Sequence, residues 1–178
     1  MIAPVGQAVA QAGGPTLFAD LVRELADTLR VAAAFVAVFS DETQLQMRTL
    51  GAVLDGRVLQ NFDYPLEGTP CAKVVGRAFR HVLRGVAVEF PPGSLFGAKG
   101  MDSYAAFPLN DSAGTPLGLL VAMDRQPIAD AELAEALLKI FAGRMIAEIE
   151  RSHVDEALRA AALAVSIEPE TSSTSTRR

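Results

Sequence analysis

The sequence predicts an α/β protein of the α+β type, in which helices flank an antiparallel sheet and a long helix forms the C-terminal part. Short β-prone segments follow one another through tight-turn signals such as Asp55-Gly56, and turns of this kind join antiparallel strands. Residues 130–166 contain no Pro and a single Gly, which is typical of one long helix. Helices at both ends of the strand region are then available to cover one face of the sheet.

Composition limits the functions that need to be considered. The chain has 178 residues, half of them apolar and 21% charged, and this fits one folded domain with tails. Its 16 Lys and Arg against 21 Asp and Glu give a formal net charge of −5, so we expect no nucleic-acid partner. The single cysteine, Cys71, permits no internal disulfide and is typical of a reducing compartment, so we expect a cytoplasmic protein.

The chain divides into three parts by composition. Residues 1–14 are apolar but lack the basic residues of a signal peptide, and we expect a flexible segment there. Residues 15–166 are expected to form a single domain with a projecting C-terminal helix. Residues 167–178 are rich in Ser and Thr, and we expect them to be disordered. No apolar run approaches the roughly 20 residues that a membrane-spanning helix needs, so we expect no membrane insertion.

The first half of the domain region predicts one helix and three strands. Apolar residues at helical spacing predict a helix over residues 15–30. The apolar run 31–40 and residues 44–54 predict two strands joined by a polar turn. Beyond Asp55-Gly56, apolar and polar residues alternate over 58–66, and this alternation predicts a third strand.

A short helix and a short strand are expected next. Thr69-Pro70 should begin the helix, with Thr69 as the N-cap and Pro70 in the first turn, and the helix should end near residue 76 or 77. Alternation over residues 79–84 predicts a strand whose inward face carries Phe79, His81 and Leu83.

Loop and hairpin signals follow. Prolines and glycines make residues 90–101 a loop, with one expected helical turn at 94–98. Residues 102–109 and 116–125 are expected to pair as a hairpin through the polar turn 110–115.

The long C-terminal helix carries apolar residues along its whole length. The residues expected to face the core are Leu133, Leu137, Ile140, Phe141, Arg144, Ile146 and Ile149. A narrower seam continues beyond them with Val154, Leu158, Ala161 and Val165. An isolated projecting helix is only marginally stable, so we expect this seam to be buried against a second copy, giving a parallel homodimer through the terminal helices.

Four segments of the sequence carry a resemblance to a known family. They are Phe62-Asp63-Tyr64-Pro65-Leu66-Glu67-Gly68-Thr69-Pro70-Cys71; Ser103-Tyr104-Ala105-Ala106-Phe107-Pro108-Leu109; Asp111-Ser112-Ala113-Gly114 with Leu117-Gly118-Leu119-Leu120; and Phe141-Ala142-Gly143-Arg144 with Glu148-Ile149-Glu150-Arg151. In this order, and over about residues 16–159, the chain resembles a free-standing GAF domain of the bacterial signalling kind.

This resemblance implies a GAF/profilin-like fold and a sensory role. The terminal helices would lie on one side of the sheet, where they often make the dimer contact, and a ligand pocket would lie under the loops on the other side. Such domains sense a small molecule or transmit a signal, and because no effector domain follows here, the output would pass to a separate effector protein such as a kinase or cyclase.

Four activities of GAF domains are tested against single residues. Cyclic-nucleotide-binding members resemble one another in an Asn-Lys pair, and this chain has none. Bilin-binding members attach the chromophore to a Cys commonly followed by His, whereas Cys71 is followed by Ala72. Free methionine sulfoxide reductases use a second, resolving cysteine that this chain lacks. Haem would need an axial ligand, for which His81 is the candidate inside the domain. No cofactor is identified by these patterns.

Two residues have a reactive and a structural interpretation. Cys71 in a first helical turn could be an activated nucleophile, or a small buried apolar residue, and we favour the second. His81 could be a ligand or a hydrogen-bonded core residue, and again we favour the second. His153 has no metal-ligand partner at helical spacing, so we expect no metal site, and no catalytic motif is present.

Aromatic and polar residues around the short helix and loop are the candidate ligand site. The aromatic rings would form apolar walls, and hydroxyl groups would orient the ligand; the alternative is a filled core. The expected ligand-binding residues are Phe62, Tyr64, Thr69, Cys71, Val75, Phe79, His81, Phe96, Ser103 and Tyr104. The nearby basic residues Arg77, Arg80 and Arg84 are interpreted as a solvated strand face, with anion binding as the alternative.

Three functional hypotheses follow. The first is a non-enzymatic sensory or regulatory domain that binds a small apolar or amphipathic molecule and signals through a dimer. The second is a redox switch or redox enzyme that uses Cys71 and an external thiol. The third is a ligand-free dimerisation or adaptor module with a filled core.

Overall fold

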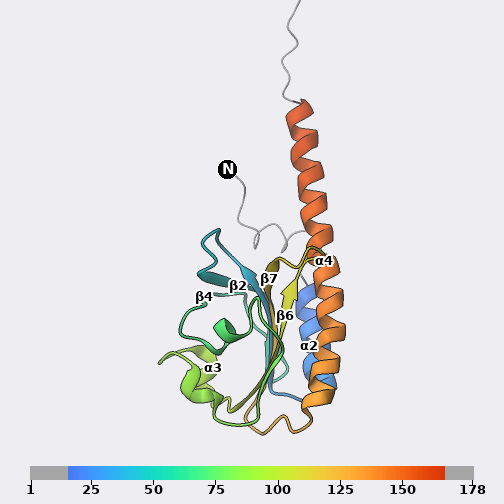
Figure 1. Cartoon of the computed structure of the whole chain (residues 1–178). Helices are drawn as coiled ribbons and strands as arrows, with labels where there is room; N and C mark the ends of the chain where they lie inside the picture. The colour runs from blue at the N-terminus through green and yellow to red at the C-terminus, as the bar shows by residue number, and fades with distance from the viewer. Residues whose placement is uncertain (1–15, 167–178) are drawn as a thin grey trace, which may run out of the picture.

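The computed structural model describes residues 16–166, and a seven-stranded sheet forms the middle layer of this part of the chain. The two longest helices cover one face, and short helices and loops cover the other (Figure 1). In chain order the elements are α2 (Leu17–Leu29), β1 (Ala33–Phe39), β2 (Gln46–Leu54), β3 (Arg57–Val58), β4 (Asp63–Pro65), the 3-10 helix η1 (Pro70–Lys73), β5 (Arg80–Val82), the 3-10 helix η2 (Val86–Glu89), α3 (Leu95–Ala98), β6 (Ser103–Asn110), β7 (Pro116–Asp124) and α4 (Ala131–Ser166). The expectations for residues 1–14 and 167–178 fall outside the described residues.

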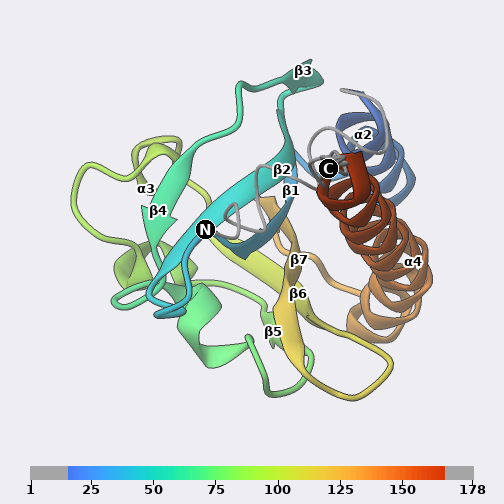
Figure 2. The same cartoon turned by 90° about the horizontal axis from the view of Figure 1, so that it is seen from above.

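The strand order is β3-β2-β1-β7-β6-β5, with β4 also paired to β2, and every pair is antiparallel. The α+β prediction is therefore confirmed, as are the helix at α2, the strands β1 and β2, the turn at α3, the β6–β7 hairpin and the long α4. Seen from above, the sheet separates α2 and α4 from α3 and the loops around it (Figure 2).

The central strands β1 and β7 are buried on both faces, so alternate residues enter two separate cores. In β1, Ala34 and Val36 pack toward the helices, whereas Phe35 and Ala37 pack toward the loops. A Cβ atom at Gly118 of β7 would collide with the Ala37 carbonyl oxygen, so only glycine allows the two strands to approach this closely.

The prediction of one strand over residues 58–66 is wrong. The structure contains two short strands there, β3 and β4. A bulge in β2 leaves Leu50 without a partner in β1, since Val36 pairs with Gly51 and Ala37 with Thr49. At this point side chains supply part of the pairing: the Asn61 amide donates to the Leu50 carbonyl at 3.3 Å, and the Thr49 hydroxyl accepts from the Phe62 N–H at 2.9 Å. Because the pairing with β2 is interrupted here, β3 ends before β4 begins.

The helix expected from Thr69 is shorter than predicted and is a 3-10 helix, η1. Thr69 does not cap it, because its hydroxyl donates instead to the Leu66 carbonyl at 2.6 Å. A second 3-10 helix, η2, was not predicted. The expected strand 79–84 is reduced to β5, and Leu83, expected to face inward, is 49% exposed because this edge strand ends before it.

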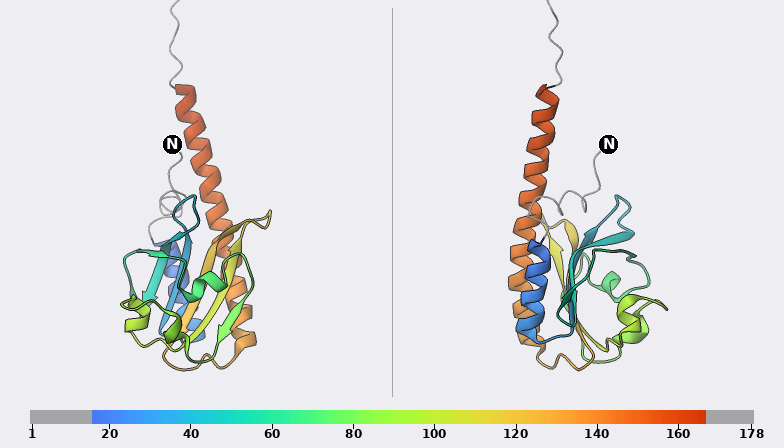
Figure 3. Two further views of the ribbon diagram at one scale, coloured as in Figure 1. Left: turned by 60° about the vertical axis from the view of Figure 1, so that its left-hand side comes forward. Right: turned by 180° about the vertical axis from the view of Figure 1, so that it is seen from behind.

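The face of helix α4 that packs on the sheet matches the predicted one in part. Phe141 and Ile149 are buried as predicted, and Leu137 and Ile146 pack partly against the core, whereas Arg144 is exposed. Its buried residues are Ala134, Leu138, Phe141, Ala142, Met145, Ile149 and Ser152. Leu133 and Ile140, expected in the core, are 51% and 62% exposed. The small side chains of Ala134 and Ala142 let the helix lie close to the sheet, so the packed face is centred beside Leu133 and Ile140 rather than on them. Beyond the sheet, α4 continues as a projecting rod, as predicted (Figure 3).

Candidate functional site

A cavity of about 320 Å³ lies on the loop side of the sheet. Strand β1 forms its floor through Phe35, β4 forms a side, and the segment that leads into α3 covers it. The lining residues are Phe35, Phe62, Asp63, Tyr64, Pro65, Thr69, Cys71 and residues 90–96. Its volume is at the lower end of the range that is typical of small-molecule sites, about 300–1,000 Å³.

Four aromatic rings connect the floor of the cavity to its cover. Phe96 of α3 stacks on Phe35 with ring centroids 5.2 Å apart, and Tyr64 meets Phe35 edge-on at 6.1 Å. Phe62 lies 6.1 Å from both Tyr64 and Phe96. Offset stacking and edge-to-face contacts are the favourable arrangements of aromatic rings, so this cluster fixes α3 above the sheet.

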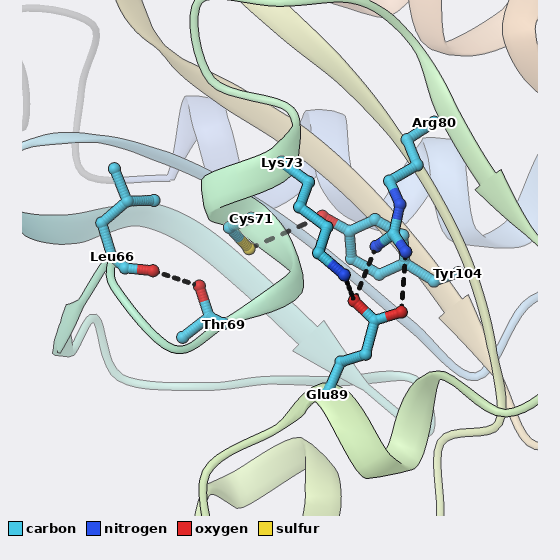
Figure 4. A network of polar contacts seen from close by, with 7 residues as sticks. All are labelled: Leu66, Thr69, Cys71, Lys73, Arg80, Glu89 and Tyr104. Carbon is cyan, nitrogen blue, oxygen red and sulfur yellow. Dashed lines mark hydrogen bonds and ion pairs between the residues drawn. The ribbon is translucent and has the colours of Figure 1, made fainter.

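Cys71 is one of the residues that line the cavity and is 2% exposed. The Tyr104 hydroxyl donates to its sulfur over 3.6 Å (Figure 4). Burial raises the pKa of the Cys71 thiol, and the nearby hydroxyl groups, Tyr104 first, lower it by a smaller amount. The thiol is thus protonated at neutral pH, and the structure favours the interpretation of Cys71 as a buried, weakly polar residue.

The hydroxyl group of Tyr64 lies close to the Cys71 sulfur. Burial raises its pKa first, and the neighbouring Cys71 sulfur raises it further. Although buried, this hydroxyl has no hydrogen-bond partner among residues 16–166. It differs in this respect from the Tyr104 hydroxyl, whose pKa is also raised by burial but which is bonded to Cys71.

A small network of charges supports the site from behind. Glu89 of η2 accepts from both terminal nitrogens of Arg80, at 2.7 and 3.0 Å, and from Lys73 at 2.9 Å (Figure 4). Arg80 and, to a smaller extent, Lys73 lower the pKa of Glu89, while partial burial opposes them. The Arg80 guanidinium also lies 6.0 Å from the centre of the Tyr104 ring. Arg80 is therefore a half-buried link between η1, β5 and η2 rather than part of a solvated basic face.

The structure brings five of the predicted ligand residues together in the cavity wall. These are Phe62, Tyr64, Thr69, Cys71 and Phe96. Tyr104 and Val75 lie in the core behind that wall. The residues whose role in a ligand site the sequence did not indicate are Phe35, Asp63, Pro65, residues 90–95 and, behind them, Glu89.

Three predicted ligand residues lie elsewhere. The Ser103 hydroxyl bonds the carbonyl oxygens of Gln126 at 2.5 Å and Asp124 at 3.2 Å, and it fixes the end of the β6–β7 hairpin. Phe79 packs against the helix-side core, and the His81 ring nitrogen Nε2 lies 2.6 Å from the Ile128 carbonyl oxygen on that same side. Phe79, just before β5, and His81 within it thus lie on the opposite face of the sheet from the cavity.

Two further features of the described chain bear on its function. In residues 16–166 no three His, Cys, Asp or Glu side chains lie together in a way that could hold a metal ion. Among the helices of that same region, none is long and apolar enough to cross a membrane.

Comparisons with known proteins identify the fold. No family model matches the sequence, and no curated protein shows significant similarity to it. Among solved structures, the GAF domain of an Acinetobacter phosphoenolpyruvate-protein phosphotransferase superimposes with a TM-score of 0.61, at 15% identity, over 86% of this chain and 92% of that one. The chain has the GAF-domain fold.

Other structures with this fold perform different tasks. The chromophore-binding domain of a bacteriophytochrome from R. palustris matches with a TM-score of 0.61, at 10% identity, over 85% of this chain and 60% of that one. A free methionine-R-sulfoxide reductase from Neisseria meningitidis, solved with its substrate, matches with a TM-score of 0.60, at 18% identity, over 85% and 87% of the two chains. Sensory domains and enzymes thus share the GAF fold, and the function has to be argued from the site.

Proposed function

We propose that this GAF-fold chain is a non-enzymatic sensory or regulatory domain that binds a small, largely apolar molecule in the aromatic cavity. The observation that carries the proposal is the cavity itself, which has aromatic walls and few polar groups, the usual composition of a small-molecule site. The ligand would contact Phe35, Phe62, Tyr64 and Phe96, with Thr69 and Cys71 at its polar end.

The position of Phe35 gives the ligand a route to the signalling helices. Phe35 lines the cavity from β1, and its neighbours Ala34 and Val36 belong to the core that α2 and α4 share. A ligand that binds one arrangement of β1 more tightly than another changes the populations of both arrangements. Occupancy of the cavity would in this way alter the packing of α4.

The output we propose is a parallel homodimer through α4, read by a separate effector protein such as a kinase or cyclase. Exposed and half-buried residues along one stripe of α4 recur with alternating spacings of four and three. They are Leu133, Leu137, Ile140, Arg144, Ala147, Arg151, Val154, Leu158, Ala161 and Val165. We call this stripe the α4 seam. It runs beside the face that packs on the sheet. Its alternating spacing of four and three is typical of a coiled coil.

Native mass spectrometry of the full chain, combined with a visible absorption spectrum, tests this proposal. We expect a dimer that retains a small molecule or takes one up from a metabolite extract of the expression host. A monomer at micromolar concentration would contradict the helix-mediated dimer. A dimer that takes up nothing would contradict ligand sensing and would favour the adaptor module.

The second candidate function is a redox switch at Cys71, because this thiol lies in the cavity wall and a reductase shares the fold. Cys71→Ser separates the two candidates. In a sensor of apolar molecules the substitution leaves ligand affinity within a few-fold of the original value, whereas in a redox protein it abolishes the response to oxidants.

A further inference from the structure

One continuous segment, residues 90–96, supplies half of the residues that line the cavity. Within this segment only the side chain of Phe96 is buried, whereas its neighbour Leu95 in α3 is exposed. Phe96 is also the residue of the segment that stacks on Phe35 in the floor. The segment therefore reaches down to the sheet through the Phe96 ring.

The Phe96 ring occupies the space directly over the floor. Its plane lies 12° from that of Phe35, with the two ring centroids 5.2 Å apart, and its centroid lies 6.1 Å from that of Phe62. Rings stacked at this distance are in direct contact, so no part of a ligand fits between them. The side chain thus takes up room that would otherwise belong to the cavity.

The backbone of α3 holds the Phe96 ring in this place. At the start of the helix the Ser94 hydroxyl accepts from the Gly97 N–H at 3.2 Å. At its end the Phe96 carbonyl accepts from the Lys99 N–H at 3.2 Å, and the Lys99 carbonyl accepts from Arg125 of the β7 end at 3.0 Å. Because both ends of α3 are fixed, the ring does not yield its place to a ligand without the loss of these contacts.

The volume that remains is enough for two rings. A cavity of about 150 Å³ holds one benzene molecule, so 320 Å³ holds about two phenyl rings. A third ring would have to stay in water or displace Phe96. Truncation of a buried phenylalanine to alanine leaves a space of about one more ring, and at Phe96 this space would join the cavity.

On the basis of the proposed function, we infer that Phe96 determines ligand size: its ring limits the cavity to molecules of about two aromatic rings. A smaller side chain at this position opens the space over Phe35 to a third ring.

Three uncharged alcohols test the inference, since no Lys, Arg or His among residues 16–166 lines the cavity. Benzyl alcohol, biphenylmethanol and terphenylmethanol carry one, two and three phenyl rings on the same hydroxymethyl group. The three-ring probe is used in its para and meta forms, so that the result does not depend on one shape. Equilibrium dialysis measures their binding to the full chain. We expect the affinity to rise about 10-fold or more from one ring to two, but less than about threefold from two rings to three, because the third ring stays in water.

Two variants of Phe96 and a matched control locate the limit. Phe96→Ala should bind at least one three-ring form about 10-fold more tightly than the original chain does, and Phe96→Leu should give a smaller gain. Phe141→Ala is the control. It removes the same ring at similar burial, 7% exposed against 5% for Phe96, but from the helix-side core, and should change each affinity by less than about twofold. Circular dichroism confirms that the variants are folded, and Phe96→Leu carries the test if Phe96→Ala is not.

The outcomes separate this inference from the proposed function. If the original chain binds the two-ring probe but neither variant of Phe96 gains affinity for a three-ring form, the size limit is overturned and the apolar pocket stands. The same holds if the original chain already binds a three-ring form about 10-fold more tightly than the two-ring probe, or if Phe141→Ala gains as much as Phe96→Ala. If no probe binds to the original chain or to the variants of Phe96, the proposed ligand pocket is overturned together with this inference.

Discussion

The Tyr104 hydroxyl donates a hydrogen bond to the Cys71 sulfur, and the two residues come from elements on opposite sides of the loop-side core. Tyr104 lies in β6, and Cys71 lies in η1. The Tyr64 hydroxyl approaches the same sulfur from β4, but its geometry does not make a hydrogen bond with any partner among residues 16–166. The two tyrosines are therefore chemically alike and equally buried at the hydroxyl, but only one of them is paired.

This difference predicts opposite effects of one substitution on stability. Tyr104→Phe removes a made hydrogen bond and should lower the free energy of unfolding by about 0.5–1 kcal/mol. Tyr64→Phe removes an unpaired buried hydroxyl and should leave that free energy unchanged or raise it by about 1 kcal/mol. Urea unfolding of the ligand-free chain measures both. Equal losses in the two variants would show that Tyr64 has a partner in the folded protein.

Burial of Cys71 predicts slow modification of its thiol. Because the group is 2% exposed and burial raises its pKa, iodoacetamide at pH 8 should alkylate it about 100-fold more slowly than a free cysteine. Alkylation should become fast in denaturing urea, which provides the control for the reagent. Rapid alkylation of the folded chain would instead support the redox function.

The same burial predicts a loss of stability in alkali. The unfolded chain releases the Cys71 proton near the ordinary pKa of 9.0, whereas the folded chain holds it to a higher pH. Ionisation thus favours the unfolded state, and the free energy of unfolding should fall as the pH rises from about 8.5 to 10. In Cys71→Ala the decline over this range should be shallower. An identical slope in the two proteins would mean that the thiol ionises as easily when folded.

The sequence predicted a structural element correctly where the signals for it lay within the element itself. The β6–β7 hairpin and α2 have turn chemistry and periodicity of their own, and both were predicted correctly. Phe35 was missed as a cavity residue because the apolar run of β1 does not say which of its side chains faces which core. The split between β3 and β4 depends on a bulge in β2, which no local pattern indicates.

Helix α4 shows a second limit of sequence reasoning. Leu133 and Ile140 are as apolar as Leu138 and Met145, yet only the second pair packs on the sheet. Apolar residues on two adjacent faces of a helix do not reveal which face meets the domain. Only the close contact that Ala134 and Ala142 of α4 make with the helix-side core resolves the choice.

The ion pairs of Glu89 predict a stability effect that depends on pH. Glu89→Gln should lower the free energy of unfolding at pH 7 by about 1 kcal/mol, because Arg80 loses a two-point partner that is largely shielded from water. Since these partners lower the pKa of Glu89, their contribution is present at neutral pH and is lost as the pH falls through that lowered pKa. The variant and the original chain should therefore converge in acid, once Glu89 is protonated in the folded chain. Glu42→Gln, in an exposed turn, is the control and should have no effect at either pH.

Gly51 of β2 lies where α2 makes a close contact with the sheet. A Cβ atom there would meet the backbone of Phe18 and Ala19, so Gly51→Ala must push the helix outward and should cost about 1–3 kcal/mol of stability. Gly143→Ala is the matched control, because this glycine of α4 has open space around it and alanine favours a helix. It should raise stability by about 0.5–1 kcal/mol. A neutral result at Gly51 would contradict the observed packing of α2.

The α4 seam makes the dimer testable with a matched pair of leucines. Leu158 lies in the seam and Leu163 lies outside it, yet their exposed fractions in the single chain are 64% and 65%. In a parallel coiled coil Leu158 meets its counterpart, so Leu158→Glu would bury two carboxylates against each other and should dissociate the dimer. Leu163→Glu adds the same charge on the side of the helix that faces solvent and should leave the dimer intact. Sedimentation equilibrium distinguishes these outcomes. If both variants stay dimeric, the interface lies elsewhere, and if both dissociate, the helices meet over a wider surface than the seam.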